Sequence, residues 1–127
     1  MSRGARTISA MLGAAVSLCG CAPALIVATE PKTVTGRVLP PYESQEECIA
    51  VMPGDRVDYA FESTQPVDFN IHFHEGKTIV MPVVREKSRG DAGMYAPPIG
   101  QHYCLMWEAG AAGATIDYRI RFRPAGN

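Results

Sequence analysis

The chain lacks an excess of charge of either sign. Its 127 residues contain 12 Lys and Arg against 13 Asp and Glu, which gives a formal net charge of −1. Binding of nucleic acid by charge needs a broad basic surface, so we expect no nucleic-acid partner. At this length the chain supports one domain with one modest core.

Long helical segments are also missing. The 10 Pro and 12 Gly argue against a helical bundle, while a hydrophobic fraction of 46% is too high for a disordered chain. Beyond the first residues, no segment has a convincing period of 3.6 residues. These absences leave a small globular domain built from strands.

Signatures of catalytic sites are absent from the sequence. It contains no Gly-x-Ser-x-Gly, no His-Glu-x-x-His and no glycine-rich phosphate loop. Glu75 beside His74 could form an acid/base pair, but neighbours on a strand point to opposite faces. We therefore expect a protein that is not an enzyme.

The first residues have the pattern of a bacterial export signal. Arg3 and Arg6 precede a charge-free run, residues 8–18, whose 11 residues fall short of the ~20 that a membrane-spanning helix needs. A short buried N-terminal helix is the alternative. The run ends in Leu18-Cys19-Gly20-Cys21, which resembles the lipobox of bacterial lipoproteins, although Cys19 stands where a small residue is usual.

The lipobox resemblance implies cleavage before Cys21 and acylation of that cysteine, with palmitate as a suitable label. Several acyl chains, at ~0.8 kcal/mol per buried methylene, anchor a protein durably in a membrane. Ala22 follows, not the Asp that signals inner-membrane retention. The resemblance therefore implies a lipoprotein of the bacterial cell envelope, on the periplasmic face of the outer membrane. Its parts are a signal peptide (1–20), a lipidated tether (21–31) and a folded domain (32–123).

Two cysteines remain for the folded domain. Cys48 and Cys104 form an even pair in an oxidising compartment, which predicts a disulfide. In the chain-entropy model, a bridge that closes a loop of more than 50 residues stabilises a domain by roughly 4 kcal/mol. The alternative is that one of the two stays a free thiol and serves as a metal ligand.

Alternation of apolar and polar residues dominates the domain and predicts strands. The seven predicted strands are 33–39, 47–52, 57–62, 67–74, 78–84, 101–108 and 116–122. Predicted turns are Pro53-Gly54-Asp55, Thr64-Gln65-Pro66, Glu75-Gly76-Lys77 and Ala109–Gly113. Residues 85–98, rich in charge, Gly and Pro, are predicted as a mobile loop. About seven strands with one disulfide predict an all-β fold, an antiparallel β-sandwich.

The domain resembles the GOLD family, the lumenal β-sandwiches of eukaryotic cargo receptors. The resemblance rests on Glu47-Cys48, on residues 53–63, on residues 67–71 and on Tyr103-Cys104-Leu105-Met106-Trp107, and it covers roughly residues 33–123. In cargo receptors an early and a late cysteine form a disulfide, and Cys48 and Cys104 stand at those places. Glu108-Ala109 replaces the Asn that often follows the late strand. The resemblance implies a binding module without catalytic activity.

Histidines on one strand offer an alternative function. His72 and His74 are two residues apart, so they share a face at about 6.5–7 Å. His102 and Met106 likewise share a face across Cys104, and together these residues suit copper or zinc. The competing interpretation is that they are polar residues on a solvated face.

Charged residues of the last strand predict pairing, not ligand binding. Arg119 and Arg121 lie on its outward face and are expected to pair with Asp117, or with Asp68 across the sheet. We therefore predict an anchored envelope lipoprotein that binds an envelope protein or small ligand without a cofactor. The alternative is a periplasmic copper- or zinc-binding lipoprotein that uses His72 and His74.

Overall fold

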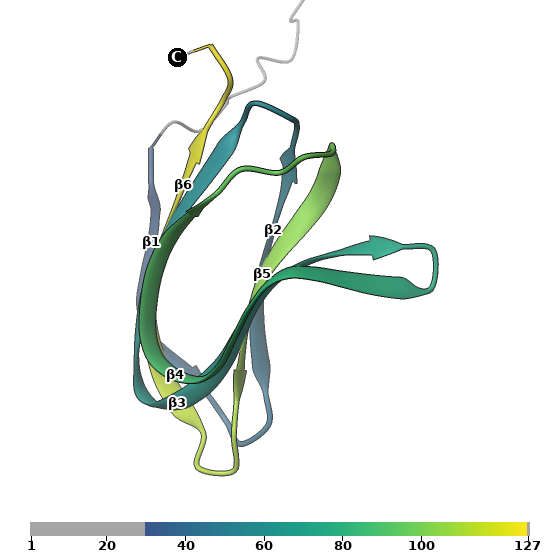
Figure 1. Cartoon of the computed structure of the whole chain (residues 1–127). Coiled ribbons are helices and arrows are strands. Elements are labelled where there is room, and N and C mark those ends of the chain that lie inside the picture. Colours follow the sequence, from purple (N-terminus) through teal and green to yellow (C-terminus); the bar gives the residue numbers. More distant parts are fainter. Residues whose placement is uncertain (1–29, 127) are drawn as a thin grey trace, which may run out of the picture.

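The computed structural model describes residues 30–126, which form one antiparallel sheet of six strands (Figure 1). The strands are β1 (Lys32–Leu39), β2 (Ser44–Val51), β3 (Arg56–Glu75), β4 (Thr78–Tyr95), β5 (Gln101–Ala109) and β6 (Ala114–Arg123). Within the described residues, no helix is long and apolar enough to cross a membrane.

The sheet curls because β3 changes partner halfway along its length. Its strand order is β1-β6-β3-β5-β2, with β4 paired to β3. The first half of β3 pairs with β6, from Arg56 opposite Arg123 to Ser63 opposite Ile116. The second half pairs with β5, from Val67 opposite Ala109 to His72 opposite Cys104. β4 follows β3 through both halves, with register shifts at the bend.

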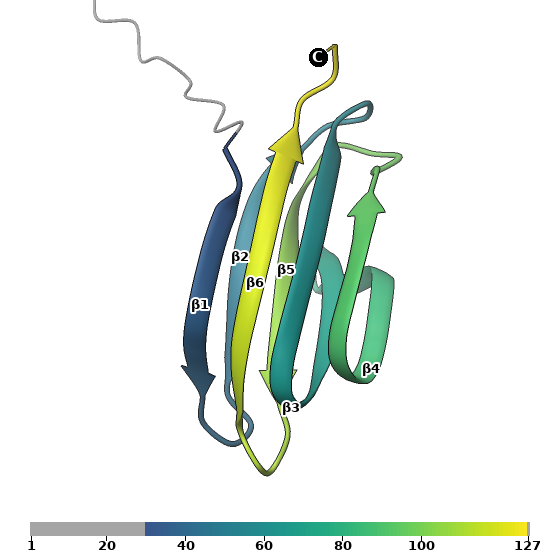
Figure 2. The same cartoon turned by 90° about the vertical axis from the view of Figure 1, so that its left-hand side faces the viewer.

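The result is a half-barrel with two facing walls (Figures 1 and 2). We call β1, β6, the first half of β3 and the last half of β4 the β6 wall. The β5 wall consists of β2, β5, the second half of β3 and the first half of β4. The tip of the β3–β4 hairpin projects beyond the β5 wall (Figure 1).

The core lies between the walls and is rich in aromatic side chains. Trp107 of β5 stacks on Tyr118 of β6 with ring centroids 4.4 Å apart, so the two walls meet at this pair. Phe69 packs against Trp107 at 5.4 Å and is fully buried. The inward positions are those that the alternation predicts, because side chains of a strand alternate between its two faces. The indole Nε1 of Trp107 is buried without a hydrogen-bond partner among the described residues.

Polar side chains join β1 and β2 at the open side of the half-barrel. Glu47 of β2 accepts hydrogen bonds from Lys32 Nζ and from the Tyr118 hydroxyl, each at 2.7 Å. Burial acts to raise the pKa of Glu47, but these two hydrogen bonds and the positive charges of Lys32 and Arg37 together outweigh it and hold that pKa below its usual value. Burial and the neighbouring carboxylate raise the pKa of Tyr118.

Two of the predicted turns are confirmed with their physical cause. At Pro53-Gly54-Asp55, the Asp55 carboxylate accepts the backbone N–H of Met52 at 2.9 Å, and Gly54 adopts a φ of 95°. Gly76, with a φ of 61°, forms the turn between β3 and β4. A positive φ is a conformation that glycine adopts without steric cost.

The predicted β-sandwich of seven strands is replaced by one curled antiparallel sheet of six strands. Thr64-Gln65-Pro66 does not end a strand but lies in the bend of β3. There the Ser63 hydroxyl donates to the Gln65 carbonyl at 2.6 Å, and the Thr64 hydroxyl accepts the N–H of Thr115 at 2.9 Å. Side chains typical of turns thus satisfy the backbone of a bent strand.

The mobile loop predicted for residues 85–98 is also wrong, because most of this segment belongs to β4. Its residues pair with the first half of β3, from Val57 opposite Tyr95 to Glu62 opposite Gly90. The segment leaves regular pairing near Lys87, whose N–H donates to the Asp68 carboxylate at 2.8 Å. Glycine and charge obscured the alternation here.

Candidate functional site on the outer face of the β5 wall

A disulfide lies at the centre of the outer face of the β5 wall. Cys48 of β2 stands directly opposite Cys104 of β5, with Cα atoms 4.0 Å apart, and the two are joined as predicted. The alternative in which one of them is a free thiol ligand is therefore wrong. On its other side Cys104 stands opposite His72 of β3. Three strands thus bring their outward side chains together around the disulfide.

The His72 side chain is buried on this face, and both of its ring nitrogens contact polar side chains. It is only 4% exposed, although it lies on the outward side of the sheet. Its Nδ1 lies 2.7 Å from Asn70 Oδ1, and its Nε2 lies 3.1 Å from Glu46 Oε1. Both ring nitrogens are therefore engaged, and the imidazole is fixed in orientation.

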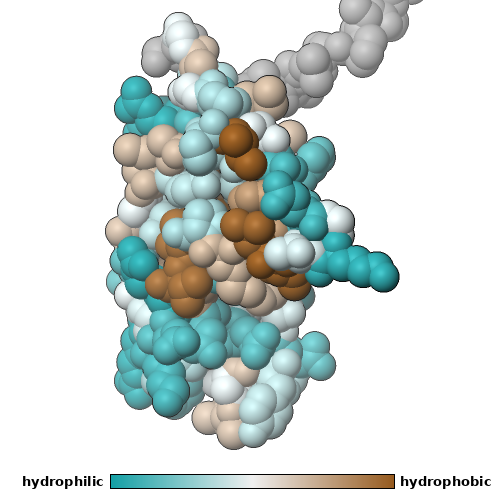
Figure 3. All heavy atoms as spheres, turned by 45° about the vertical axis from the view of Figure 1, so that its right-hand side comes forward, coloured by the Kyte–Doolittle hydropathy of each residue, from teal (hydrophilic) through white to brown (hydrophobic). Residues whose placement is uncertain are grey.

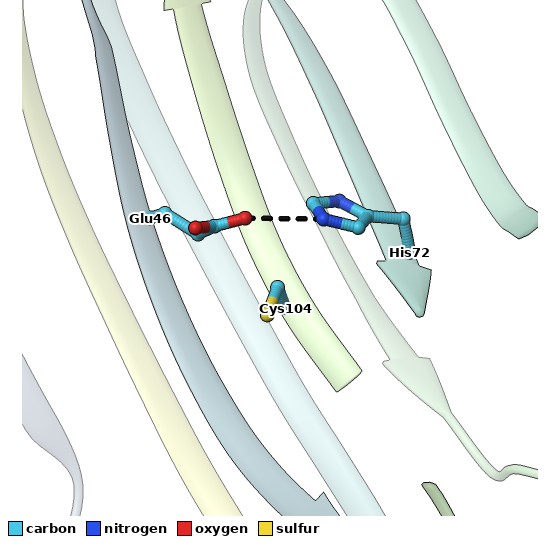
Figure 4. A group of neighbouring side chains, drawn as sticks. All are labelled: Glu46, His72 and Cys104. Carbon is cyan, nitrogen blue, oxygen red and sulfur yellow. Dashed lines mark ion pairs between the residues drawn. The ribbon is translucent and has the colours of Figure 1, made fainter. Parts of the chain in front are cut away.

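Glu46 reaches from β2 over β5 to His72 on β3. Figure 4 shows its carboxylate directed at the imidazole, with Cys104 beside the two. The ligand atoms of Glu46, His72 and Cys104 lie within 4.8 Å of one another. Because the Cys104 sulfur is bonded to Cys48, it is no thiolate, and only a carboxylate and an imidazole remain as strong ligands.

The other predicted metal residues lie on the same face but less close together. The ring of His74 is 5.3 Å from that of His72 between centroids, and it is exposed. Met106, half-buried, stands opposite both Asn70 and Glu46. His102, exposed, stands opposite Ala50 on the edge strand β2.

Sequence reasoning missed Glu46 and Asn70. Their position in the strand alternation could have found them, because Glu46 is two residues before Cys48 and Asn70 is two residues before His72. Residues two apart on a strand share a face. Without the register of β2 on β5 and of β5 on β3, however, nothing in the sequence brings Glu46 to His72.

Exposed apolar side chains flank this network on β4. Ile79, Met81 and Val84 are 51%, 46% and 46% exposed, and we call them the hairpin patch. Ile79 stands opposite His74, and Val84 opposite Asn70. Figure 3, which brings this side of the molecule forward, shows strongly hydrophobic groups at the surface among hydrophilic ones. Apolar surface gathered beside a rigid polar network is typical of a binding site for another molecule.

No model of a protein family matches the chain, and no curated protein sequence matches it. Solved structures do. PliG of Aeromonas hydrophila, a periplasmic inhibitor of g-type lysozyme, has a TM-score of 0.58 at 11% identity, over 76% of this chain and 89% of PliG. What the two share is the fold.

Two further structures resemble the chain less. The mitogen YPM of Yersinia pseudotuberculosis has a TM-score of 0.48 at 11% identity, over 78% of this chain and 89% of YPM. A de novo designed double-stranded β-helix has a TM-score of 0.41 at 21% identity, over 75% of this chain and all of the design. The likeness to PliG establishes a β-rich fold. The resemblance to the GOLD family remains a prediction, and the lipobox with Cys21 lies outside the described residues.

Proposed function

We propose that the chain is a lipoprotein of the bacterial envelope that binds a protein partner through the hairpin patch and catalyses no reaction. The observation that carries this proposal is the exposure of Ile79, Met81 and Val84 on a hairpin that projects from the body of the domain. A soluble domain gains stability when such side chains are buried, and here they are presented to solvent. A partner that covers them recovers that energy.

The polar network beside the hairpin patch offers directional hydrogen bonding, which apolar side chains cannot provide and which would fix the orientation of a partner. Glu46 is 42% exposed at its side chain and is held by His72, so its carboxylate offers a fixed acceptor at the rim of the patch. An apolar centre with a few fixed polar groups at its rim is the usual composition of a protein interface. The fold of PliG, which serves in that protein to inhibit a lysozyme, supports a protein partner for this fold.

The anchor completes the proposal. Acylation of Cys21 would hold the domain at the membrane through the residues before β1, and the domain would then meet its partner in the periplasm. This assignment rests on the resemblance of Leu18-Cys19-Gly20-Cys21 to the lipobox.

A photo-crosslinking amino acid at position 81 of the lipidated chain tests the partner in the bacterial envelope. We expect one discrete protein adduct from position 81 and none from position 37, which is exposed on β1. The adduct should disappear when Ile79→Asp places a charge in the hairpin patch. Equal adducts from both positions, or none from position 81, would contradict the proposal. Titration of the purified protein with g-type lysozyme tests the partner class that PliG suggests.

Metal binding is a second candidate, favoured by the approach of Glu46 and His72 to one another. With His74 beside them, they could offer one carboxylate and two imidazoles to copper or zinc. Titration with copper decides it. Submicromolar binding that is lost in His72→Ala and kept in His102→Ala would establish the site, whereas no submicromolar binding by the unmodified chain would exclude it.

A further inference from the structure

Four arginines gather on the outer face of the β6 wall, opposite to the hairpin patch. They are Arg56 at the start of β3 and Arg119, Arg121 and Arg123 on β6. Arg56 stands directly opposite Arg123, and the three on β6 alternate along one face. We call them the arginine stripe.

The predicted pairing of these arginines with acidic residues is largely missing. Among the described residues, neither Arg119 nor Arg121 forms a salt bridge. Asp117 instead accepts the N–H of Gly36 at 2.6 Å, and Asp68 accepts that of Lys87. Only Arg123 is paired, with Asp58. The carboxylate of Asp58 lies among the four arginines, and Glu62 and Asp117 continue the same outward face at the end away from Arg56. The outward positions of β3 and β6 on this wall therefore carry a local charge of +1 (4 − 3), with the positive charge gathered at the Arg56 end.

This local charge is opposite in sign to that of the domain. Residues 30–126 carry 10 Lys and Arg against 13 Asp and Glu, a net charge of −3 (10 − 13). Small residues next to the stripe leave the guanidinium groups uncovered, since Ala92 of β4 stands opposite Ala60 of β3. A hollow of about 310 Å³ opens there, lined by Asp58, Tyr59, Ala60, Arg119, Arg121 and Arg123.

The chain enters the domain beside this stripe. Lys32, the first residue of β1, stands opposite Ile120, and Thr33 stands opposite Arg119. Cys21 lies 11 residues before Lys32, so even a fully extended tether spans at most about 40 Å. An acyl chain on Cys21 would therefore keep a membrane surface within reach of the arginine stripe.

We propose that the arginine stripe docks the domain onto anionic phospholipid headgroups of the membrane that carries the chain. Arginine is suited to this task because its planar guanidinium binds phosphate through two hydrogen bonds. The proposal deepens the proposed anchoring and rests on it for the source of the membrane. Because the stripe and the hairpin patch lie on opposite walls, docking through the stripe turns the hairpin patch toward the periplasm.

Sedimentation with lipid vesicles tests the stripe without the anchor. The probe is the chain from residue 21 to 127 with Cys21→Ser, mixed with vesicles of pure phosphatidylcholine or of equal parts phosphatidylcholine and phosphatidylglycerol. We expect binding to the phosphatidylglycerol vesicles alone. Each basic side chain near an anionic surface is worth about fivefold in binding, so Arg119→Gln with Arg121→Gln should lower the partition coefficient about 25-fold. Binding should also vanish in 1 M salt.

A matched control separates the stripe from total charge. Lys77→Gln with Arg85→Gln removes two charges at exposed positions of the hairpin turn and of the first half of β4, on the β5 wall, and it should leave binding within about twofold, because screened charges distant from the membrane surface contribute little. Equal losses in both double variants, or no preference for phosphatidylglycerol, would overturn the docking surface. Neither result bears on acylation, which palmitate labelling of Cys21 tests separately, or on the adduct from position 81.

Discussion

Removal of the disulfide between Cys48 and Cys104 should destabilise the domain strongly. The bridge joins residues 56 apart in sequence. In the chain-entropy model, opening a loop of that length returns roughly 14 cal/mol/K of entropy to the unfolded chain, or about 4 kcal/mol at 25 °C. That is a large share of the 5–15 kcal/mol by which domains are usually stable.

The test compares the protein with the double variant Cys48→Ala and Cys104→Ala by urea unfolding at pH 7. We expect a loss of about 4 kcal/mol and, at about 4–8 °C per kcal/mol for a domain of this size, a Tm lower by roughly 16–32 °C. Dithiothreitol should reproduce the loss in the unmodified protein and change nothing in the variant. A loss under 1 kcal/mol would refute the reasoning, because the eight register pairs between β2 and β5 would then suffice to hold those strands.

Three further predictions concern Glu47, Gly93 and the lipid anchor. The folded-state pKa of Glu47 lies below its unfolded value. Its contribution to the free energy of unfolding is therefore present above about pH 4.3 and is lost as the pH falls through the folded pKa. Glu47→Gln should lower the free energy of unfolding by about 1 kcal/mol at pH 7 and by progressively less below pH 4, as measured by urea unfolding. Gly93→Ala should cost about 1–3 kcal/mol, since a Cβ there would lie 2.7 Å from the Tyr59 hydroxyl, whereas Gly110→Ala, with open space around it, should stay within about 0.5 kcal/mol in thermal melts. Metabolic palmitate labelling should mark the unmodified chain and the Cys19→Ser variant but not the Cys21→Ser variant. Label that is lost in Cys19→Ser and kept in Cys21→Ser would show that Cys19 is the acylated cysteine.

The sequence predicted most of the core and few of the long-range neighbours. Strict alternation around Phe69 and Trp107 identified the buried faces, because one side of each strand must exclude water. It failed at Thr64-Gln65-Pro66 and beyond residue 85. Local residue preferences favoured a turn at the first place and a loop at the second. In the structure the Ser63 hydroxyl donates to the Gln65 carbonyl and the Asp68 carboxylate accepts the N–H of Lys87, and these hydrogen bonds make bent strands possible.

The candidate site was predicted only in part for a related reason. His72 was found because it lies on a strongly alternating segment, and Cys48 and Cys104 were found because they form an even pair in an oxidising compartment. Glu46 contacts His72 across β5, and Asn70 does so along its own strand. Arg119 and Arg121 were expected to pair with Asp117 or Asp68, but these two carboxylates accept backbone N–H groups, and Asp58, which stands opposite Arg121, pairs with Arg123. Which partner each of these side chains binds depends on the register between strands and on competition between hydrogen-bond donors, and no single segment of the sequence determines either.

The continuity of β3 and β4 through both walls has a consequence for folding. Each wall has one strand pair outside this hairpin, β1–β6 or β2–β5. The two walls are joined through the hairpin, because β6 and β5 pair with successive halves of β3. Neither wall can detach while the other persists without breaking the hairpin at its bend. The domain should therefore unfold as one cooperative unit. The hairpin, formed between neighbours in sequence across Gly76, closes the shortest loop and provides the template on which β5 and β6 add.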